Sequence, residues 1–305
     1  MKVTFRHLTL ALTALLLVPL ASCGKDNKPT PTPPDPQPAK REDVIGKVRS
    51  ITFTFRDKMA KPQSRITITY NKQLRFTGYI DGILENDKLI PFHEGKNTYD
   101  ESTGHLIQEQ SREVASDKWQ TKRYTYTNGL LTRVEIDEPY DKRPEYRQTI
   151  IQYTYGSNQK KKAGVHTVVF MDTEPDNKTI NYYSYSYEGE VEVENIYADK
   201  EMKTLISRNK RTYDSEGRIT KEELYHVNIV DNKEVVSLSS RNIMRYGIFG
   251  EKLFDETYRY DDLGQVSEHS ITGIRYTKYN AQGLPIEGVP LEKKDEVVTL
   301  EYTFY

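Results

Sequence analysis

Cysteine and tryptophan are almost absent from this 305-residue chain, which has one of each. A single Cys excludes an internal disulfide framework and a zinc site built from cysteines. The charge is also nearly balanced, with 44 Lys and Arg against 45 Asp and Glu, so nothing electrostatic argues for a nucleic-acid partner. The hydrophobic share is only 36%. The length still allows one large all-β domain or two smaller domains.

The one long apolar run lies at the N-terminus. Lys2 and Arg6 precede the apolar residues Leu8 to Leu20, and small residues follow at positions 21 and 22. A basic start, a short apolar run and a small-residue end are typical of a secretory signal peptide, since a spanning helix is longer. We therefore predict that residues 1–22 are a signal peptide, with an uncleaved membrane anchor as the alternative.

The end of this run, Leu20-Ala21-Ser22-Cys23, resembles the lipobox of bacterial lipoproteins. In that family the Cys thiol takes up a diacylglyceryl group, the preceding peptide is removed, and the freed amine is acylated by a chain such as palmitate. Two or more acyl chains anchor a protein stably in a bilayer. The resemblance implies lipidation at Cys23 and a location on the bacterial outer membrane, on its periplasmic face or at the cell surface. The alternative is a secreted protein with an incidental Cys.

Proline is concentrated directly after Cys23. Residues 24–40 hold six of the 14 prolines. Such a segment favours the extended polyproline II conformation, at roughly 3 Å per residue, and reaches up to about 50 Å. We predict that residues 23–40 are the lipidated Cys and a tether, and that residues 41–305 form a single folded domain.

In residues 41–305, apolar and polar side chains alternate in short runs. Examples are the runs 51–56, 65–70, 191–194 and 298–304. A period of two predicts antiparallel strands with one apolar, buried face and one polar face, so Glu192 and Glu194 fall on the polar face. No stretch of helical period exceeds about three turns. The pattern predicts an all-β domain, a long antiparallel meander of hairpins that closes into a barrel or folds over as packed sheets.

The turns carry an internal repeat, Tyr-x-x-x-Gly. The strict copies contain Tyr213, Asp214 and Gly217, then Tyr260, Asp261 and Gly264, then Tyr279, Asn280 and Gly283, and a looser copy spans 246–250. Asp or Asn opens a type I turn by accepting backbone hydrogen bonds, and Gly takes the following position of positive φ. The Tyr is expected to end one strand, and the apolar residue two after Gly to begin the next.

This Tyr-Asp-x-x-Gly-x-Ile/Val unit resembles the YD (Rhs-type) repeat. The mature chain is also similar to a group of Bacteroidota-type lipoproteins of unknown function whose domains are described as porin-like β folds. The resemblance implies the hairpin geometry and an outer-membrane lipoprotein. It implies no reaction, and the copies are too few to build the shell that YD repeats form around a toxin.

Catalytic and metal-binding motifs are missing from the sequence. The five histidines after the signal are His93, His105, His166, His226 and His269, and no two lie within four residues. There is no GxSxG elbow, no Walker loop and no GxGxxG. Adjacent acids such as Glu222-Glu223 are expected by chance among 45. We predict a non-enzymatic protein without a cofactor or a metal.

Tyrosine is the one abundant aromatic residue, with 23 copies. Tyr183, Tyr185 and Tyr187 alternate along one strand and so share a face. Planar rings on a sheet can stack on sugars or peptides, with the hydroxyls bonding polar groups. The alternative, which we favour, is a ladder of cross-strand pairs in the core.

Together these features predict a lipid-anchored cell-envelope protein that binds a ligand or partner or has a structural role in the envelope. Its expected partners are the membrane, through the lipid, and a glycan or an envelope protein. One alternative is a glycan-acting hydrolase whose carboxylate pair the spacing does not reveal. A second is an outer-membrane pore, because the chain ends in residues 300–305 like the aromatic last strand of such barrels.

Overall fold

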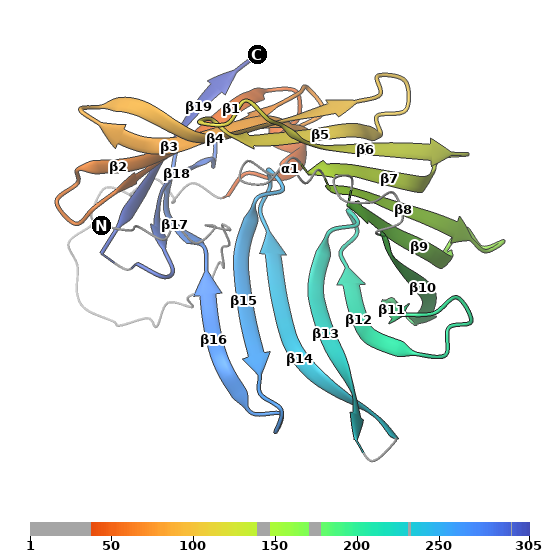
Figure 1. Ribbon diagram of the computed structural model, residues 1–305. Coiled ribbons are helices and arrows are strands. Elements are labelled where there is room, and N and C mark those ends of the chain that lie inside the picture. Colours follow the sequence, from red (N-terminus) through yellow and green to blue (C-terminus); the bar gives the residue numbers. More distant parts are fainter. Residues whose placement is uncertain (1–37, 139–146, 171–177, 231–232, 294) are drawn as a thin grey trace, which may run out of the picture.

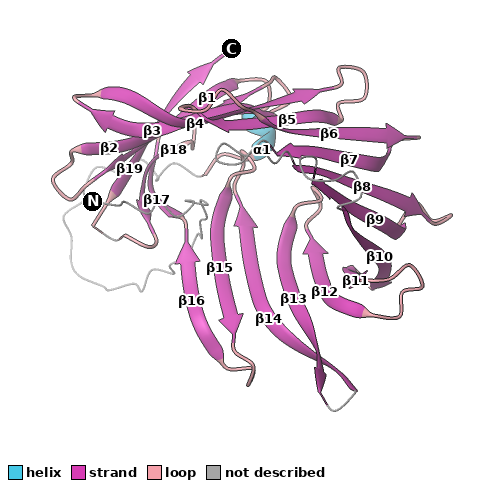
Figure 2. Cartoon of the chain, in the orientation of Figure 1, coloured by secondary structure: helices cyan, strands magenta, loops and turns pink. Residues whose placement is uncertain are grey.

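The computed structural model describes residues 38–138, 147–170, 178–230, 233–293 and 295–305, so the predicted signal peptide and Cys23 lie outside the described residues. One short helix and nineteen strands make up the described chain (Figure 2). They are α1 (Arg41–Val44), β1 (Val48–Arg56), β2 (Pro62–Tyr70), β3 (Phe76–Glu85), β4 (Lys88–Tyr99), β5 (Leu106–Glu113), β6 (Gln120–Thr127), β7 (Leu130–Glu138), β8 (Arg147–Tyr155), β9 (Lys161–Phe170), β10 (Lys178–Glu188), β11 (Val191–Tyr197), β12 (Leu205–Tyr213), β13 (Ile219–Val230), β14 (Lys233–Tyr246), β15 (Lys252–Tyr260), β16 (Val266–Thr272), β17 (Ile274–Tyr279), β18 (Pro285–Pro290) and β19 (Val297–Phe304).

The strands form one antiparallel meander. From β1 to β16 each strand pairs with the next, as β1 does with β2 and β15 with β16. The last three strands pair in turn, and β19 returns to pair with β1. The β1–β19 pairing brings the first and last strands together, and β16 leads directly into β17 through Gly273. The curved sheet is therefore nearly closed into a barrel (Figure 1). The predicted all-β meander is confirmed.

A shared hydrogen-bond pattern forms the hairpin turns. In the β15–β16 turn, the Asp261 N–H donates to the carbonyl of Gln265, and the Gly264 N–H donates back to the carbonyl of Asp261, both at 2.9 Å. The Asp261 carboxylate accepts the N–H groups of Leu263 and Gln265. Gly264 has φ +74°, a backbone region that costs glycine little. The turn is a type I turn followed by a bulge, and the strand register shifts at Tyr260.

The same bonding occurs at turns whose positive-φ residue is not glycine. Ala60, Leu74 and Gln159 have φ of 60°, 56° and 61°, and each donates its N–H to a carbonyl three residues earlier. Leu74 accepts this conformation while its side chain is only 2% exposed in the core. The repeat is therefore a backbone unit that is more frequent than its glycines indicate.

The tyrosine hydroxyls connect successive hairpins. Four of them donate to a carbonyl beside an earlier turn, with one other turn between the two in the sequence. The acceptor residue lies two positions after the positive-φ residue of that earlier turn: Tyr99 donates to Phe76 at 2.8 Å, Tyr155 to Leu131 at 2.7 Å, Tyr246 to Ile219 at 2.8 Å and Tyr302 to Pro285 at 2.6 Å. These carbonyls lie where the bulge disturbs the ladder, and a phenol hydroxyl supplies a donor there. This contact gives a physical reason for Tyr at the strand ends.

The hydrophobic core lies at one part of the sheet. Ile51, Phe53, Val298 and Leu300 from β1 and β19 are at most 4% exposed, and Phe249 from the β14–β15 turn packs among them. We call the side of the sheet that carries Ile51 and Phe53 the core face, and the other side the opposite face. Away from β1 and β19, the core face becomes polar.

Candidate functional site: a buried carboxylate and tyrosine cluster

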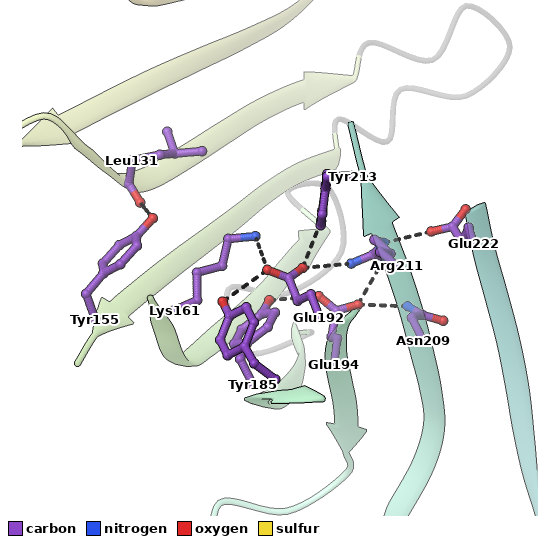
Figure 3. Close-up of polar contacts among 11 residues, drawn as sticks. Leu131, Tyr155, Lys161, Tyr185, Glu192, Glu194, Asn209, Arg211, Tyr213 and Glu222 are labelled. Atoms are coloured by element: carbon purple, nitrogen blue, oxygen red, sulfur yellow. Dashed lines mark hydrogen bonds and ion pairs between the residues drawn. The ribbon is translucent and has the colours of Figure 1, made fainter. Parts of the chain in front are cut away.

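The core face of β11 carries two buried carboxylates. Glu192 is 5% exposed and Glu194 is 7% exposed, while Val193 between them is 3% exposed. The prediction that the glutamates lie on a solvent-facing polar side is therefore wrong, because both faces of β11 are buried at positions 192–194. Buried carboxylates are tolerated where cations and hydroxyls offset the lost hydration. Figure 3 shows these partners, which come from the neighbouring strands.

Glu192 is the centre of the first group of contacts. Its carboxylate accepts the hydroxyls of Tyr187 at 3.2 Å and Tyr213 at 2.9 Å. The Lys161 amine lies 3.5 Å away and the Arg211 guanidinium 3.8 Å away. Four neighbours from β9, β10 and β12 thus surround one carboxylate.

Glu194 is the centre of the second group. It accepts the Tyr185 hydroxyl at 2.8 Å and the Asn209 amide at 2.7 Å, and the Arg211 guanidinium lies 3.2 Å away. Arg211 also donates to Glu222 on β13 at 2.7 Å. We call Lys161, Tyr185, Tyr187, Glu192, Glu194, Asn209, Arg211, Tyr213 and Glu222 the carboxylate cluster; it joins strands β9 to β13.

The electrostatics of the cluster keep its charges fixed. Burial alone would raise the pKa of the Glu194 carboxyl, but Arg211, Tyr185 and Asn209 together hold it below its ordinary value. Burial, and then the charge of Glu194, raise the pKa of the Tyr185 phenol. Burial opposes the charge of Arg211, yet Glu194 and Glu222 raise its pKa overall. At neutral pH the carboxylate is ionised, the phenol is protonated, and the guanidinium is charged.

The three tyrosines predicted as a stacking surface all lie on β10, where Tyr185 and Tyr187 belong to this cluster and Tyr183 lies beside it. Tyr185 is 8% exposed, and its ring contacts those of Tyr183 and Tyr153 at centroid distances of 6.5 and 6.2 Å. The Tyr183 hydroxyl lies 2.9 Å from Nδ1 of His166, and the Lys160 amine lies 4.4 Å above the Tyr187 ring. Ligand stacking on these rings stays a prediction, and their contacts favour the core-ladder alternative.

The other predicted residues are dispersed over the fold. Tyr213 ends β12 and joins the cluster through Glu192, and Asp214 and Gly217 form the turn that follows. The second and third copies of the repeat form the β15–β16 turn, with Tyr260, Asp261 and Gly264, and the β17–β18 turn, with Tyr279, Asn280 and Gly283. The repeat therefore builds turns around the sheet and brings only Tyr213 to the carboxylate cluster.

Several titratable groups outside the carboxylate cluster form local pairs. The adjacent acids Glu222 and Glu223 point to opposite faces, since Glu222 bonds Arg211 and Glu223 bonds Arg241 at 2.9 Å. His269 lies 2.9 Å from Glu256. Over the described ranges, no group of three or more His, Cys, Asp or Glu side chains has the geometry of a metal site. In the same ranges, no helix has the length and apolar character needed to cross a bilayer.

Sequence reasoning missed Glu192, Glu194 and Arg211 as a connected set. Arg211 lies in a run of mixed polar residues, 205–212, with no local signal of burial. The pairing of Glu192 with Arg211, and of Glu194 with Asn209, depends on the strand register. The tyrosine-rich segment 182–187 beside Val-Glu-Val-Glu was the one available signal, because phenols and carboxylates on paired strands bond each other.

Comparison with known proteins gives weak similarities of fold. No family model matches the chain, and no curated protein does. Among solved structures, a porin-like protein from Bacteroides uniformis ATCC 8492 is 14% identical over 89% of this chain and 100% of that chain, with a TM-score of 0.33. A protein of unknown function from Bacteroides fragilis NCTC 9343 is 16% identical over 50% of this chain and 90% of that one, with a TM-score of 0.25.

A third match is a chain of the TcdB2–TccC3–Cdc42 structure, from Tc toxin proteins with Rhs/YD repeats. It is 9% identical over 75% of this chain but 17% of that chain, with a TM-score of 0.28. A porin-like protein and a YD-repeat protein are thus both among the structural neighbours. The likeness is too weak to assign this chain to either group.

Proposed function

We propose that the protein is a lipid-anchored envelope protein whose β domain binds a ligand or a partner protein without catalysing a reaction. The anchor is proposed from the sequence Leu20-Ala21-Ser22-Cys23, which follows the apolar run and precedes the proline-rich tether. Lipidation at Cys23 would hold the domain at the outer membrane, on its periplasmic face or at the cell surface.

The observation that supports the non-catalytic part of the proposal is the set of hydrogen-bond and charged partners around the two buried carboxylates. A glycosidase needs one protonated carboxylic acid with a raised pKa beside a second carboxylate. Glu194 has a lowered pKa and accepts hydrogen bonds from Tyr185 and Asn209, while Glu192 is surrounded by hydroxyls and cations. Both glutamates therefore act as acceptors that hold the strands together.

The alternative of a membrane-spanning pore is weakened by the opposite face. A spanning barrel presents a continuous apolar band to lipid. On β12, β13 and β14, however, Lys210, Glu223 and Arg241 form one cross-strand row. Lipid would surround three charged side chains, including the Glu223–Arg241 ion pair, and charged side chains facing lipid destabilise a barrel.

The anchor is tested by growing cells with an alkyne-labelled palmitate and comparing the wild type with Cys23→Ala. We expect label and detergent-phase partitioning for the wild type, and neither for Cys23→Ala. Ser22→Ala keeps a small residue before the Cys and serves as the matched control, which should label normally. A wild-type protein without label would overturn the anchor.

The non-catalytic role is tested by assaying the full chain against a panel of polysaccharides for new reducing ends. We expect none above the background of the Glu194→Gln variant. Release of reducing ends by the wild type that Glu194→Gln abolishes would establish the hydrolase instead. Binding to a glycan array or capture of an envelope protein by the wild type supports the proposed role.

A further inference from the structure

A groove of about 630 Å³ lies across strands β6 to β10, beside the loop that joins β11 to β12. Volumes of this size are typical of small-molecule sites. The groove shares only strands β9 and β10 with the carboxylate cluster and has no residue in common with it, and on β10 the Tyr182 side chain faces the other side from Tyr185 and Tyr187. Its lining residues are Thr125, Thr132, Arg133, Gln152, Tyr153, Thr154, Ala163, Gly164, Val165, Tyr182, Lys200 and Met202.

The floor of the groove is one row of cross-strand neighbours. Arg133 pairs with Gln152, Gln152 with Val165, and Val165 with Tyr182. Directly paired residues point to the same side of a sheet, so these four side chains share the opposite face. Ala163 beside them is small and leaves room for a flat ligand above the sheet.

The wall of the groove is the loop 198–204, which its own hydrogen bonds hold in place. The Asp199 carboxylate accepts the backbone N–H groups of Lys203 at 3.0 Å and Thr204 at 2.6 Å. Met202 has φ +55° and donates its N–H to the carbonyl of Asp199, as the positive-φ residues of the other turns do. Its side chain lines the groove, and methionine adapts its shape to different ligands.

The lining has the chemistry of a site for an anion. It contains Arg133 and Lys200 and no Asp or Glu. Arg133 donates from Nε and Nη2 to Glu135, so its charge is partly engaged. Lys200 has no ion pair within the described residues, and its side chain is exposed. The amide of Gln152 and the hydroxyls of three threonines add neutral donors and acceptors.

We propose that this groove binds an acidic sugar unit, a hexuronate within a polysaccharide, and this inference rests on the proposed ligand-binding role. The Lys200 ammonium pairs with the uronate carboxylate, and the ring of Tyr182 packs against the apolar face of the sugar. Gln152 and Thr154 bond the sugar hydroxyls. An open groove of this shape accepts a segment within a chain as well as a free end.

The test is isothermal titration calorimetry of the full-length protein in detergent with a short oligogalacturonate. The neutral probe is the same oligomer with its carboxyls methyl-esterified, and the competing class is represented by oligoglutamate. We expect the acid to bind more tightly than the ester, and the difference to shrink at high salt. Tyr182→Ala should weaken binding about tenfold, and Lys200→Ala about threefold.

Lys203→Ala is the matched control, because it removes an amine from the same loop outside the groove and should leave affinity unchanged. Circular dichroism of each variant checks that the sheet is intact. Lys200→Glu reverses the charge at the same position and should weaken binding more than Lys200→Ala does. Equal binding of acid and ester would overturn the proposal, as would preference for oligoglutamate.

Two outcomes separate this inference from the proposed function. If oligogalacturonate binds the wild type and the Tyr182 and Lys200 variants equally, the groove assignment fails while ligand binding stands. If the wild type binds no probe, no member of a glycan array and no envelope protein, the proposed function itself fails.

Discussion

Glu251 in the β14–β15 turn is expected to make the stability of the fold depend on pH. Its carboxylate accepts the Phe249 N–H at 2.9 Å and the Tyr276 hydroxyl at 3.3 Å, beside the hydrophobic core. Burial raises the pKa of this carboxyl to about 7, from an ordinary value of 4.5. No cation within hydrogen-bonding distance offsets the lost hydration among the described residues, in contrast to Glu194.

The sign of the effect follows from the raised pKa. Between pH 4.5 and 7 the folded state holds a proton that the unfolded chain has lost, so the free energy of unfolding falls as the pH rises through this window. Each pKa unit corresponds to about 1.4 kcal/mol, so the loss reaches about 3 kcal/mol above pH 7. Glu251→Gln removes the titration and should flatten this part of the curve.

The measurement is urea unfolding from pH 4 to pH 8, followed by far-ultraviolet circular dichroism and by the fluorescence of Trp119. The difference between the free energies of unfolding of the wild type and Glu251→Gln, taken at each pH, isolates the contribution of Glu251. The part of this difference that changes with pH reports the titration, while a constant part reflects the exchange of the hydrogen-bonding group. Glu101→Gln, in an exposed turn, is the control and should leave the slope unchanged. Parallel curves for the wild type and Glu251→Gln would refute the pKa argument.

Five further substitutions test the turns, the carboxylate cluster and the tyrosine contacts. Gly264→Ala should lower the free energy of unfolding by about 1 kcal/mol, because its φ is +74° and no atom lies within 4 Å of an added Cβ. Ala60→Gly, in the equivalent conformation, should raise it by about 0.5 kcal/mol, and thermal denaturation must give opposite signs for the two. Arg211→Met should cost about 3–5 kcal/mol by leaving the buried Glu194 carboxylate without a cation, and adding Glu194→Gln should recover part of the loss; purely additive costs would contradict the pairing. Tyr246→Phe removes a hydroxyl that donates at 2.8 Å to a β13 carbonyl and should cost about 1 kcal/mol in urea unfolding, so no measurable change would contradict that role.

The strands and hairpins were predictable because their signals are local. Alternation over 51–56 and 298–304 predicts strands, and these segments became β1 and β19. The motif Tyr-Asp-x-x-Gly contains every group that the turn needs, namely an acceptor side chain and a residue suited to positive φ. The return of β19 to pair with β1 is a long-range event, and the sequence left closed and folded sheets as alternatives.

The looser copy at 246–250 shows why motif searching found only part of the repeat. Gly247 stands where the strict copies have Asp or Asn, so the turn has no acceptor side chain at that position. Glu251 supplies the acceptor from the far side of the turn, through its bond from the Phe249 N–H. A substitution of this kind preserves the backbone pattern while changing the residues, and spacing alone does not reveal it.

The polar core face explains why tyrosine is so frequent in this chain. Apolar burial is concentrated around β1 and β19, so the distant strands β9 to β13 have little hydrophobic core to hold them together. A phenol covers neighbouring apolar atoms with its ring and places a donor at its tip. Tyr155 and Tyr246 use that donor on turn carbonyls, whereas Tyr185 and Tyr213 use it on buried carboxylates. Phenylalanine would remove one hydrogen-bond donor from each of these acceptors at a cost of about 1–3 kcal/mol each, so a long sheet with a small core selects tyrosine.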